Sequence, residues 1–116
     1  MVQEIQTADY SVSLDAQSNT VQFSGELALS NPGEYDPINS LLSEVADQEP
    51  DVLTLDLRKL DFVNSSGISM LSKFVLGMRK KKGTQVVVLG SEDIAWQGKS
   101  LRNLEKLLPG LKLELT

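Results

Sequence analysis

The chain has 116 residues, of which 41% are hydrophobic and 23% charged, so it is long enough to fold one domain (residues 1–116) and too short for two. Its 16 acidic and 11 basic residues give a formal net charge of −5, which argues against non-specific nucleic-acid binding, because that needs a cationic surface. It has no cysteine and no histidine, which excludes disulfides, thiolate nucleophiles, Ser-His-Asp triads and histidine- or thiolate-ligated zinc sites.

The chain start and the hydropathy pattern give no sign of export or of a membrane anchor. Residues 1–10 lack a cationic start followed by an apolar run, so we expect no signal peptide. No apolar stretch approaches the roughly 18 residues that a bilayer-spanning helix needs. The expectation is a cytoplasmic protein without membrane insertion.

The first third of the chain predicts a hairpin and then a helix. Apolar and polar residues alternate at 10–14 and again at 21–27, and residues 15–19 supply turn chemistry between them. The segment 30–33 has the composition of a turn and ends the strand pattern. A helix is predicted from Asp36 as N-cap with Pro37 at the first helical position. Its apolar face has helical spacing, at Ile38, Leu41, Leu42 and Val45.

The middle of the chain predicts two further strands with a helix between them. Leu53 to Leu57 alternate as a strand, and a second helix follows from Ile68 to Met78, with the basic run 79–82 in its last turn and Gly83 at its end. The nearly all-apolar run 85–89 predicts a strand that is covered on both faces or lies deep in a sheet.

The last third predicts a third helix and a final strand. The third helix is predicted to start at Ser91, Glu92 and Asp93. Gly98 is predicted to interrupt it, and Ser100 to cap a last helical piece. Residues 111–115 alternate as a strand. The predicted order is β-β-α-β-α-β-α-β, an α/β domain with a five-stranded mixed sheet and helices mainly on one face.

The segment Asn64-Ser65-Ser66-Gly67 is the candidate functional site. It follows a strand's carboxyl end, where open α/β sheets usually place their sites. In one interpretation Ser65 or Ser66 is simply the N-cap of the second helix. In the other, a phosphate on Ser66 lies at the positive end of that helix and adds about −1.5 to −2 charges. Its neighbours would then be the N–H groups of Gly67, Ile68 and Ser69, and Gly67 would also let a partner's backbone approach closely.

This segment is part of a longer resemblance. Residues 53–75, LTLDLRKLDFVNSSGISMLSKFV, resemble the central motif of the STAS domain, which is found in bacterial anti-sigma-factor antagonists and related switch proteins. That motif is a hydrophobic strand ending in Asp, a short apolar segment, Asp-Ser-Ser/Thr-Gly and an amphipathic helix. Here Asp56 ends the strand, 60–63 is the apolar segment and 64–67 is the switch. The predicted element order agrees with the family over nearly the whole chain.

The resemblance implies a function and partners. In antagonists of this family, the residue before the glycine is phosphorylated by a serine kinase with a histidine-kinase-like ATP site, which is commonly also the anti-sigma factor. Phosphorylation breaks the complex of antagonist and kinase, and a metal-dependent serine phosphatase restores it. By position, the implied phosphoacceptor is Ser66, with Ser65 as the less favoured one. The implied partner-binding residues are Asn64, Ser65, Ser66, Gly67, Ser69, Asn31 and Gly33.

One residue departs from the family pattern. Asn64 stands where antagonists usually carry Asp. The amide keeps a hydrogen-bonding role but removes a negative charge, which would reduce repulsion of an incoming phosphate and would also remove a carboxylate able to orient the acceptor hydroxyl.

Two other features have a plain structural interpretation beside a functional one. The basic run 79–82 could contact an acidic partner or a membrane surface, but cations at a helix end are already favourable with the helix dipole. Trp96, the single tryptophan, could form a partner pocket or pack in the core.

Three function hypotheses remain open at the level of sequence. The first is a phosphorylation-controlled interaction switch that is a substrate of enzymes and not itself an enzyme, with no cofactor and no metal site. The second is a non-phosphorylated STAS subunit of a transporter ATPase or signalling scaffold. The third is small-ligand binding in a cleft beside 64–67, which no residue pattern supports.

Overall fold

A six-stranded sheet forms the centre of the structure, a computed structural model that describes residues 3–116. Strand order in space follows the order in the chain. β1 to β3 pair antiparallel and β3 to β6 pair parallel, which confirms the predicted mixed α/β sheet. The strands are β1 (Glu4–Gln6), β2 (Tyr10–Asp15), β3 (Thr20–Leu27), β4 (Val52–Val63), β5 (Gln85–Gly90) and β6 (Lys112–Leu115). The sixth strand is β1, which is three residues long and too short to show a period of its own.

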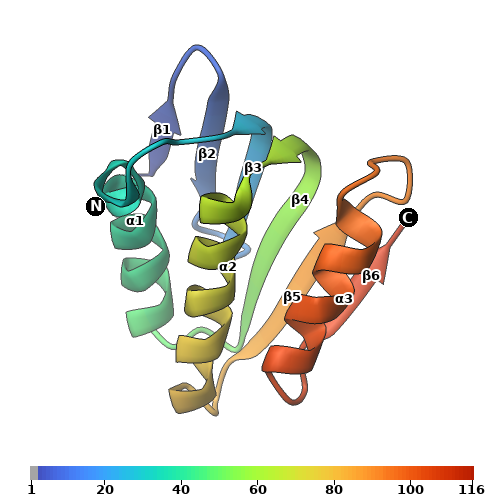
Figure 1. Cartoon of the computed structure of the whole chain (residues 1–116). Helices are drawn as coiled ribbons and strands as arrows, with labels where there is room; N and C mark the ends of the chain where they lie inside the picture. Colours follow the sequence, from blue (N-terminus) through green and yellow to red (C-terminus); the bar gives the residue numbers. More distant parts are fainter. Residues whose placement is uncertain (1–2) are drawn as a thin grey trace.

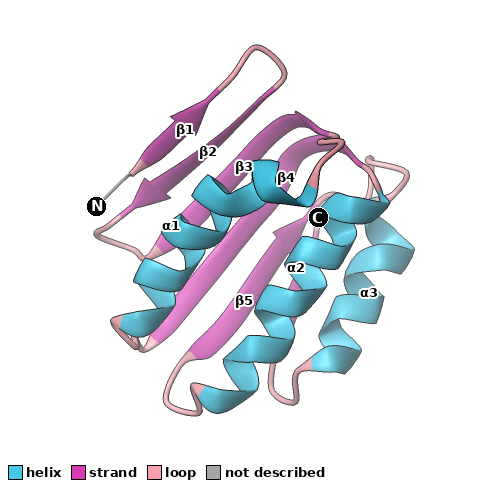
Figure 2. Cartoon of the chain, turned by 60° about the vertical axis from the view of Figure 1, so that its left-hand side comes forward, coloured by secondary structure: helices cyan, strands magenta, loops and turns pink. Residues whose placement is uncertain are grey.

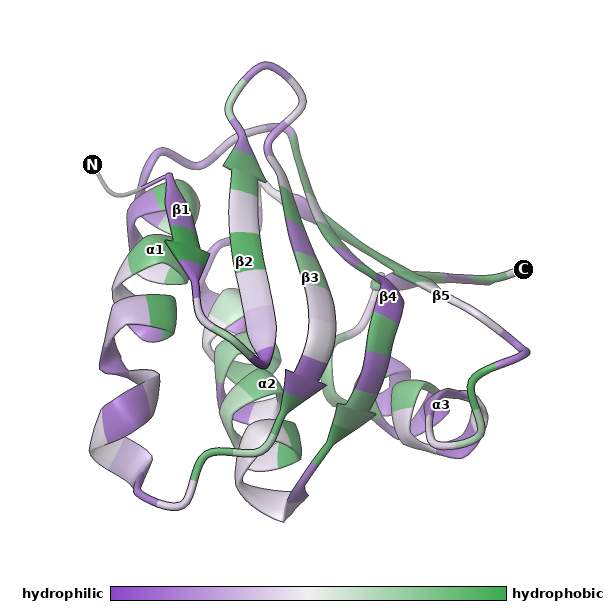
Figure 3. Cartoon of the chain, turned by 90° about the horizontal axis from the view of Figure 1, so that it is seen from above, coloured by the Kyte–Doolittle hydropathy of each residue, from purple (hydrophilic) through white to green (hydrophobic). Residues whose placement is uncertain are grey.

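Three α-helices cover one face of the sheet (Figures 1 and 2). The helical segments are η1 (Pro32–Tyr35), α1 (Asp36–Asp47), α2 (Ser65–Gly77), η2 (Met78–Lys80) and α3 (Gln97–Leu107). Apolar and polar residues alternate along the strands (Figure 3), so one set of side chains packs beneath the helices. None of the helices within residues 3–116 combines the length and the apolar composition needed to cross a bilayer.

The exposed second face of the sheet decides between the two alternatives predicted for β5. Val86 and Val88 are buried under the helices, whereas Val87 and Leu89 are only half-buried on the open face. The strand therefore lies deep in the sheet, between β4 and β6, but helices cover only one of its faces.

β4 is longer and less regular than the sequence predicted. It runs to Val63, and its pairing with β3 shifts register twice, between Gln22 and Ser24 and between Gly25 and Glu26. Each shift inserts one extra residue into β4, which is the definition of a β-bulge. The bulges break the two-residue alternation after Leu57 and carry the end of the strand to the start of α2.

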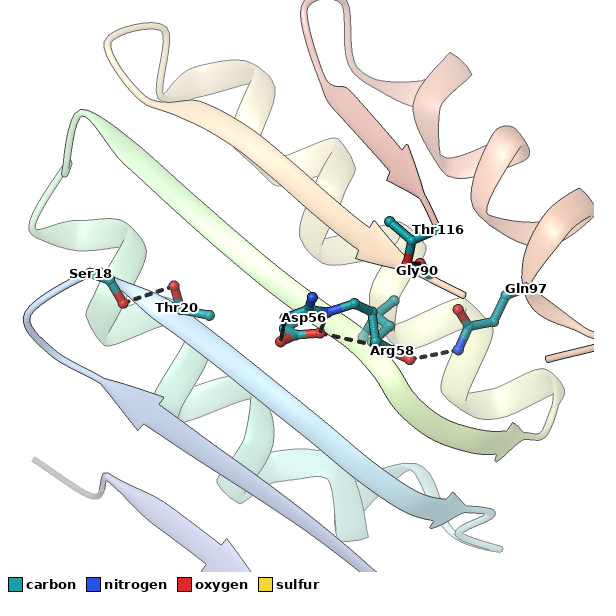
Figure 4. Close-up of polar contacts among 8 residues, drawn as sticks. Ser18, Thr20, Asp56, Arg58, Gly90, Gln97 and Thr116 are labelled. Carbon is teal, nitrogen blue, oxygen red and sulfur yellow. Dashed lines mark hydrogen bonds and ion pairs between the residues drawn. The ribbon is translucent and has the colours of Figure 1, made fainter. Parts of the chain in front are cut away.

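Gln97, at the start of α3, points toward the part of β4 that lies beyond its pairing with β5 (Figure 4). Gln97 is fully buried, and its amide nitrogen donates to the carbonyl oxygens of Leu57 (2.6 Å) and Leu60 (3.0 Å). Its amide oxygen accepts from the N–H of Ser91 (2.7 Å). Trp96 is half-buried and also donates to the Leu60 carbonyl (3.0 Å), so it packs against the core.

Two predicted helix starts are wrong in detail. α3 begins at Gln97, because residues 91–96 form turns that deliver Gln97 to the bulged strand, and Gly98 lies inside the helix without interrupting it. Asp36 is not an N-cap but the first residue of α1, because η1 leads directly into that helix. The second helix also ends earlier than predicted, at Gly77, and continues as η2.

Candidate functional site at the β4–α2 junction

Asn64 caps α2. Its backbone is extended, its side-chain oxygen accepts from the N–H of Gly67 (2.9 Å), and its carbonyl oxygen accepts from the N–H of Ile68 (3.0 Å). The expectation that Ser65 or Ser66 is the cap is therefore wrong, because both serines lie inside the first turn. Asparagine and serine cap helices about equally well, so composition alone did not separate the three candidates.

The Asn64 side chain also ties the junction to the loop after β3. Its oxygen accepts from the Tyr35 hydroxyl (3.0 Å), and its amide nitrogen donates to the carbonyl oxygen of Leu29 (3.1 Å). The Tyr35 hydroxyl in turn accepts from the N–H of Leu29 (3.4 Å). These bonds form a closed ring between residues 29, 35 and 64, and they require a side chain that both accepts and donates.

This ring gives a physical reason for asparagine at position 64. An ionised aspartate could still accept from Gly67 and Tyr35, but it has no hydrogen to donate to the Leu29 carbonyl. Its second oxygen would then face another acceptor. The amide is therefore matched to the loop that this chain places beside the junction.

Tyr35 keeps its proton in this arrangement. The residue is 2% exposed, and burial raises the pKa of Tyr35 above its ordinary value, although the hydrogen bond from Leu29 opposes part of that rise. The phenol is thus neutral at physiological pH and can donate to Asn64. No sequence pattern links residue 35 to residue 64, and Tyr35 was missed as part of the site.

Ser66 lies half-buried at the mouth of a groove between α1 and α2, while Ser65 is exposed. The groove has a volume of about 660 Å³, and its lining includes Pro32, Tyr35, Ser66, Ser69 and Lys73. The expected phosphate neighbours need one correction, because Asn64 already uses the N–H groups of Gly67 and Ile68. Helix geometry leaves instead the N–H groups of Ser65 and Ser66 without an intrahelical acceptor.

Gly67 is buried and has a packing role. A Cβ at this position would lie 2.2 Å from Cγ2 of Val63 and 3.4 Å from the hydroxyl of Tyr35. The absent side chain therefore points toward the end of β4, and glycine lets the first turn of α2 sit directly on it. Close approach of a partner to Gly67 stays a prediction.

The remaining predicted partner-binding residues surround the same edge. Ser69 is exposed one turn further along α2 and lines the groove. Asn31 caps η1 by accepting from the N–H of Gly33 (3.0 Å), and both residues are exposed. β3 and β4 are parallel neighbours with Leu27 beside Val63, so the loop after β3 lies beside the junction.

Phe62 is a further exposed residue that the sequence did not single out. It is 47% exposed, two residues before the cap of α2, and the second bulge of β4 sets its orientation. Among residues 3–116, no group of three or more acidic side chains could hold a metal ion. The site therefore presents hydroxyls, first-turn N–H groups and an exposed aromatic ring.

Comparison with known proteins concerns the family and the fold. The sequence profile of the STAS domain matches residues 15–96, which is most of the chain. No curated protein matches the sequence. The fold is similar to that of SiaC of Pseudomonas aeruginosa, with a TM-score of 0.71 and 12% identity over 99% of this chain and 98% of that one.

Two further solved structures are similar over nearly their full length. One is a chain in the crystal structure of the diguanylate cyclase SiaD with its activator SiaC from Pseudomonas aeruginosa, with a TM-score of 0.73, 13% identity and 98% coverage of both chains. The other is an anti-sigma factor antagonist from Mycobacterium paratuberculosis, with a TM-score of 0.66 and 18% identity over 95% of this chain and 90% of that one. At these identities the likeness concerns the fold.

Proposed function

The chain belongs to the STAS domain family, and we propose that it is a protein-interaction switch of the anti-sigma-factor-antagonist type. Its partner docks at the β4–α2 junction, and phosphorylation of Ser66 releases that partner. Ser65 is the second candidate for the modification. The proposed partners are a serine kinase with a histidine-kinase-like ATP site and a metal-dependent serine phosphatase, and the proposed place of action is the cytoplasm.

The observation that carries this proposal is that Asn64, and not Ser66, caps α2. Because Asn64 supplies the helix cap, the fold does not need the Ser66 hydroxyl for that role. Ser66 is nevertheless held in the first turn of a helix and partly open to solvent at the mouth of the groove. A hydroxyl that is positioned but structurally dispensable is suited to reversible modification.

A phosphate on Ser66 should be compatible with the folded protein but unfavourable in its complex with the partner. A phosphate on Ser66 would lie at the positive end of the α2 dipole, near the two N–H groups that lack an intrahelical acceptor. The fold would therefore tolerate the added charge of about −1.5 to −2. A partner surface built for a neutral hydroxyl would have to desolvate that charge, which weakens binding.

The proposed docking surface consists of residues around the exposed end of α2. It comprises Phe62, Ser65, Ser66, Ser69, Asn31 and Gly33. Phe62 supplies the large exposed aromatic ring typical of an interface anchor, and the serines supply small polar contacts around it. Asn64 and Gly67 act from beneath, by holding the first turn in place.

The test is to purify the protein from its native cells and map phosphorylation by intact mass and phosphopeptide analysis. Phosphate on Ser66, lost in Ser66→Ala and retained in the matched variant Ser40→Ala on the exposed side of α1, would support the proposal. Both variants should stay as stable as wild type within about 0.5 kcal/mol, because neither hydroxyl caps a helix. If the protein carried no phosphate in any growth condition, the result would count against the switch.

A second candidate is an adaptor that binds its partner without phosphorylation. Two observations favour it: the neutral Asn64 in place of the usual Asp, and the fold similarity to SiaC, which is described as the activator of a diguanylate cyclase. The adaptor predicts that Ser66→Ala binds its partner normally and that Ser66 stays unmodified in cells. The switch predicts a modified Ser66.

A further inference from the structure

The basic run Arg79–Lys82 lies at the opposite end of the molecule from Ser66. α2 has 13 residues, so about 20 Å of helix separates the two ends. Cations near a helix C-terminus interact favourably with its dipole, which accounts for part of this cluster. In a chain with a net charge of −5, four consecutive cations are still a local exception.

A second groove opens beside this run. It has a volume of about 650 Å³, within the range of small-molecule sites. Its charged lining residues are three cations and one acid: Arg79, Lys81, Lys82 and Asp51. Its apolar wall comes from the start of β5 and the loop after α3, and includes Val86, Leu108 and Pro109.

The cations of this groove differ in how far the protein already uses them. Arg79 donates from Nε to the carbonyl oxygen of Leu107 (2.7 Å), which holds the guanidinium at the rim and leaves its two terminal NH₂ groups for another acceptor. Lys81 contacts the exposed Asp47 at 3.4 Å. Within residues 3–116, Lys82 and Arg79 form no ion pair with a carboxylate.

Thr84 is an independent sign of a missing partner. It lines the same groove, is 9% exposed, and its hydroxyl oxygen has no hydrogen-bond partner in the described part of the chain. A buried polar group without a partner costs about 1–3 kcal/mol, so native proteins rarely keep one without a reason. The hydroxyl oxygen is itself buried, so a contact with a molecule in the groove would require this side chain to move.

We propose that this groove binds a small molecule carrying two or more phosphate groups. Arg79 would contact the phosphates through its free NH₂ groups, Lys82 would add a second positive charge, and Thr84 would donate its hydroxyl. A groove with three cations and one acid suits a ligand with several negative charges better than a ligand with one carboxylate. The planar guanidinium of arginine can also donate two parallel hydrogen bonds to phosphate oxygens. The groove shares Met78 and Lys81 with the groove beside Ser66, but Arg79, Lys82 and Thr84 line only this one.

The test is an NMR titration of the full chain with inorganic pyrophosphate. The proposal expects saturable amide shifts confined to residues 79–86 and 107–110. The double variant Arg79→Gln/Lys82→Gln should weaken binding at least about tenfold, the effect of losing one charge-assisted hydrogen bond or more. The matched control is Lys99→Gln/Arg102→Gln, which removes the same charge from the exposed side of α3.

The outcomes separate a site from general electrostatics. Equal weakening in the two double variants would overturn the proposal, because net charge alone would then explain binding. Absence of saturable shifts up to millimolar pyrophosphate would also overturn it.

Two further arms address Thr84 and the source of the phosphate. Thr84→Val keeps the shape of the side chain, removes the hydroxyl, and should weaken binding at least about threefold without loss of thermal stability. Unchanged affinity would contradict the role of Thr84. Binding to phosphatidylglycerol vesicles without binding to pyrophosphate would contradict a small-molecule site and favour a membrane surface.

Discussion

Asn64 shows at the scale of one residue why this junction differs from the family pattern. Its side chain accepts two hydrogen bonds and donates one, to partners from three different segments of the chain. The sequence could indicate that a small polar residue caps α2. It could not indicate which one, because the deciding partners, Leu29 and Tyr35, are 35 and 29 residues away.

The first prediction concerns Asn64→Asp. The carboxylate loses the bond to the Leu29 carbonyl and faces it as a second acceptor, which should destabilise the protein by about 1 kcal/mol at neutral pH, after a partial offset from the helix dipole. Protonation restores a donor, so the deficit should shrink as the pH falls toward the carboxyl pKa. Urea unfolding of both proteins across that range checks this, and an equal stability at neutral pH would contradict it.

At the scale of elements, Gly67 determines how closely α2 sits on the end of β4. In Gly67→Ala the new Cβ overlaps the stiff side chain of Val63, so we expect a loss of about 1–3 kcal/mol. The double variant Gly67→Ala/Val63→Ala removes the overlapping methyl. It should be more stable than the sum of the two single effects predicts, whereas strict additivity would show that the contact is not the cause.

Gln97 connects α3 to the bulged part of β4 through hydrogen bonds. Gln97→Leu keeps the volume but leaves the carbonyls of Leu57 and Leu60 without this donor and the N–H of Ser91 without its acceptor. We expect a loss of about 2–3 kcal/mol in chemical denaturation. Gln97→Glu retains an acceptor but no donor and should also be destabilised. Wild-type stability of both variants would argue against this role.

The regular elements were predictable from periodicity, and the irregular ones were not. The hairpin of β2 and β3, the inward face of α1 and the final strand follow simple spacing and are confirmed. β4 loses its period at two bulges, and α3 starts where Gln97 meets that strand. Both features depend on contacts between distant segments, which a single sequence does not display.

At the scale of the whole molecule, a charged pair lies on the open face of the sheet. Asp56 is 4% exposed and accepts from Nε and NH2 of Arg58, each at 2.9 Å (Figure 4). The hydrogen bond from Arg58 holds the pKa of Asp56 below its ordinary value of 3.8, although burial opposes part of this shift. The pair therefore stabilises the fold at pH values above the ordinary pKa of aspartate. This contribution is lost as the pH falls through the lowered pKa of Asp56.

Acid unfolding tests this pair. Arg58→Gln should raise the Asp56 pKa, so the variant should be less stable than wild type at neutral pH, and this deficit should shrink as the pH falls through the lowered pKa of the wild-type carboxyl. The measurement is the free energy of unfolding in urea from neutral to strongly acidic pH. Curves that stay parallel over the whole range would show that Arg58 does not set the ionisation of Asp56.

The location of the candidate site was predictable because the carboxyl ends of parallel strands meet at one edge of a sheet. That residues 31–33 lie beside 64–69 was implied only by the resemblance to the STAS family, and the structure places them so. The groove that joins Ser66 to α1 and the exposure of Phe62 depend on side-chain packing and were not predictable. The roles of these residues in partner binding stay predictions.

The central claim is that phosphate on Ser66 controls docking. The most direct measurement is the affinity of the protein for the kinase that modifies it, with Ser66 unmodified and with Ser66 stoichiometrically phosphorylated. The account predicts that the phosphate raises the dissociation constant at least about 100-fold, or about 2.7 kcal/mol, while the circular dichroism and melting of the protein stay unchanged. Equal affinity of the two forms, with Ser66 confirmed as phosphorylated, would contradict the account.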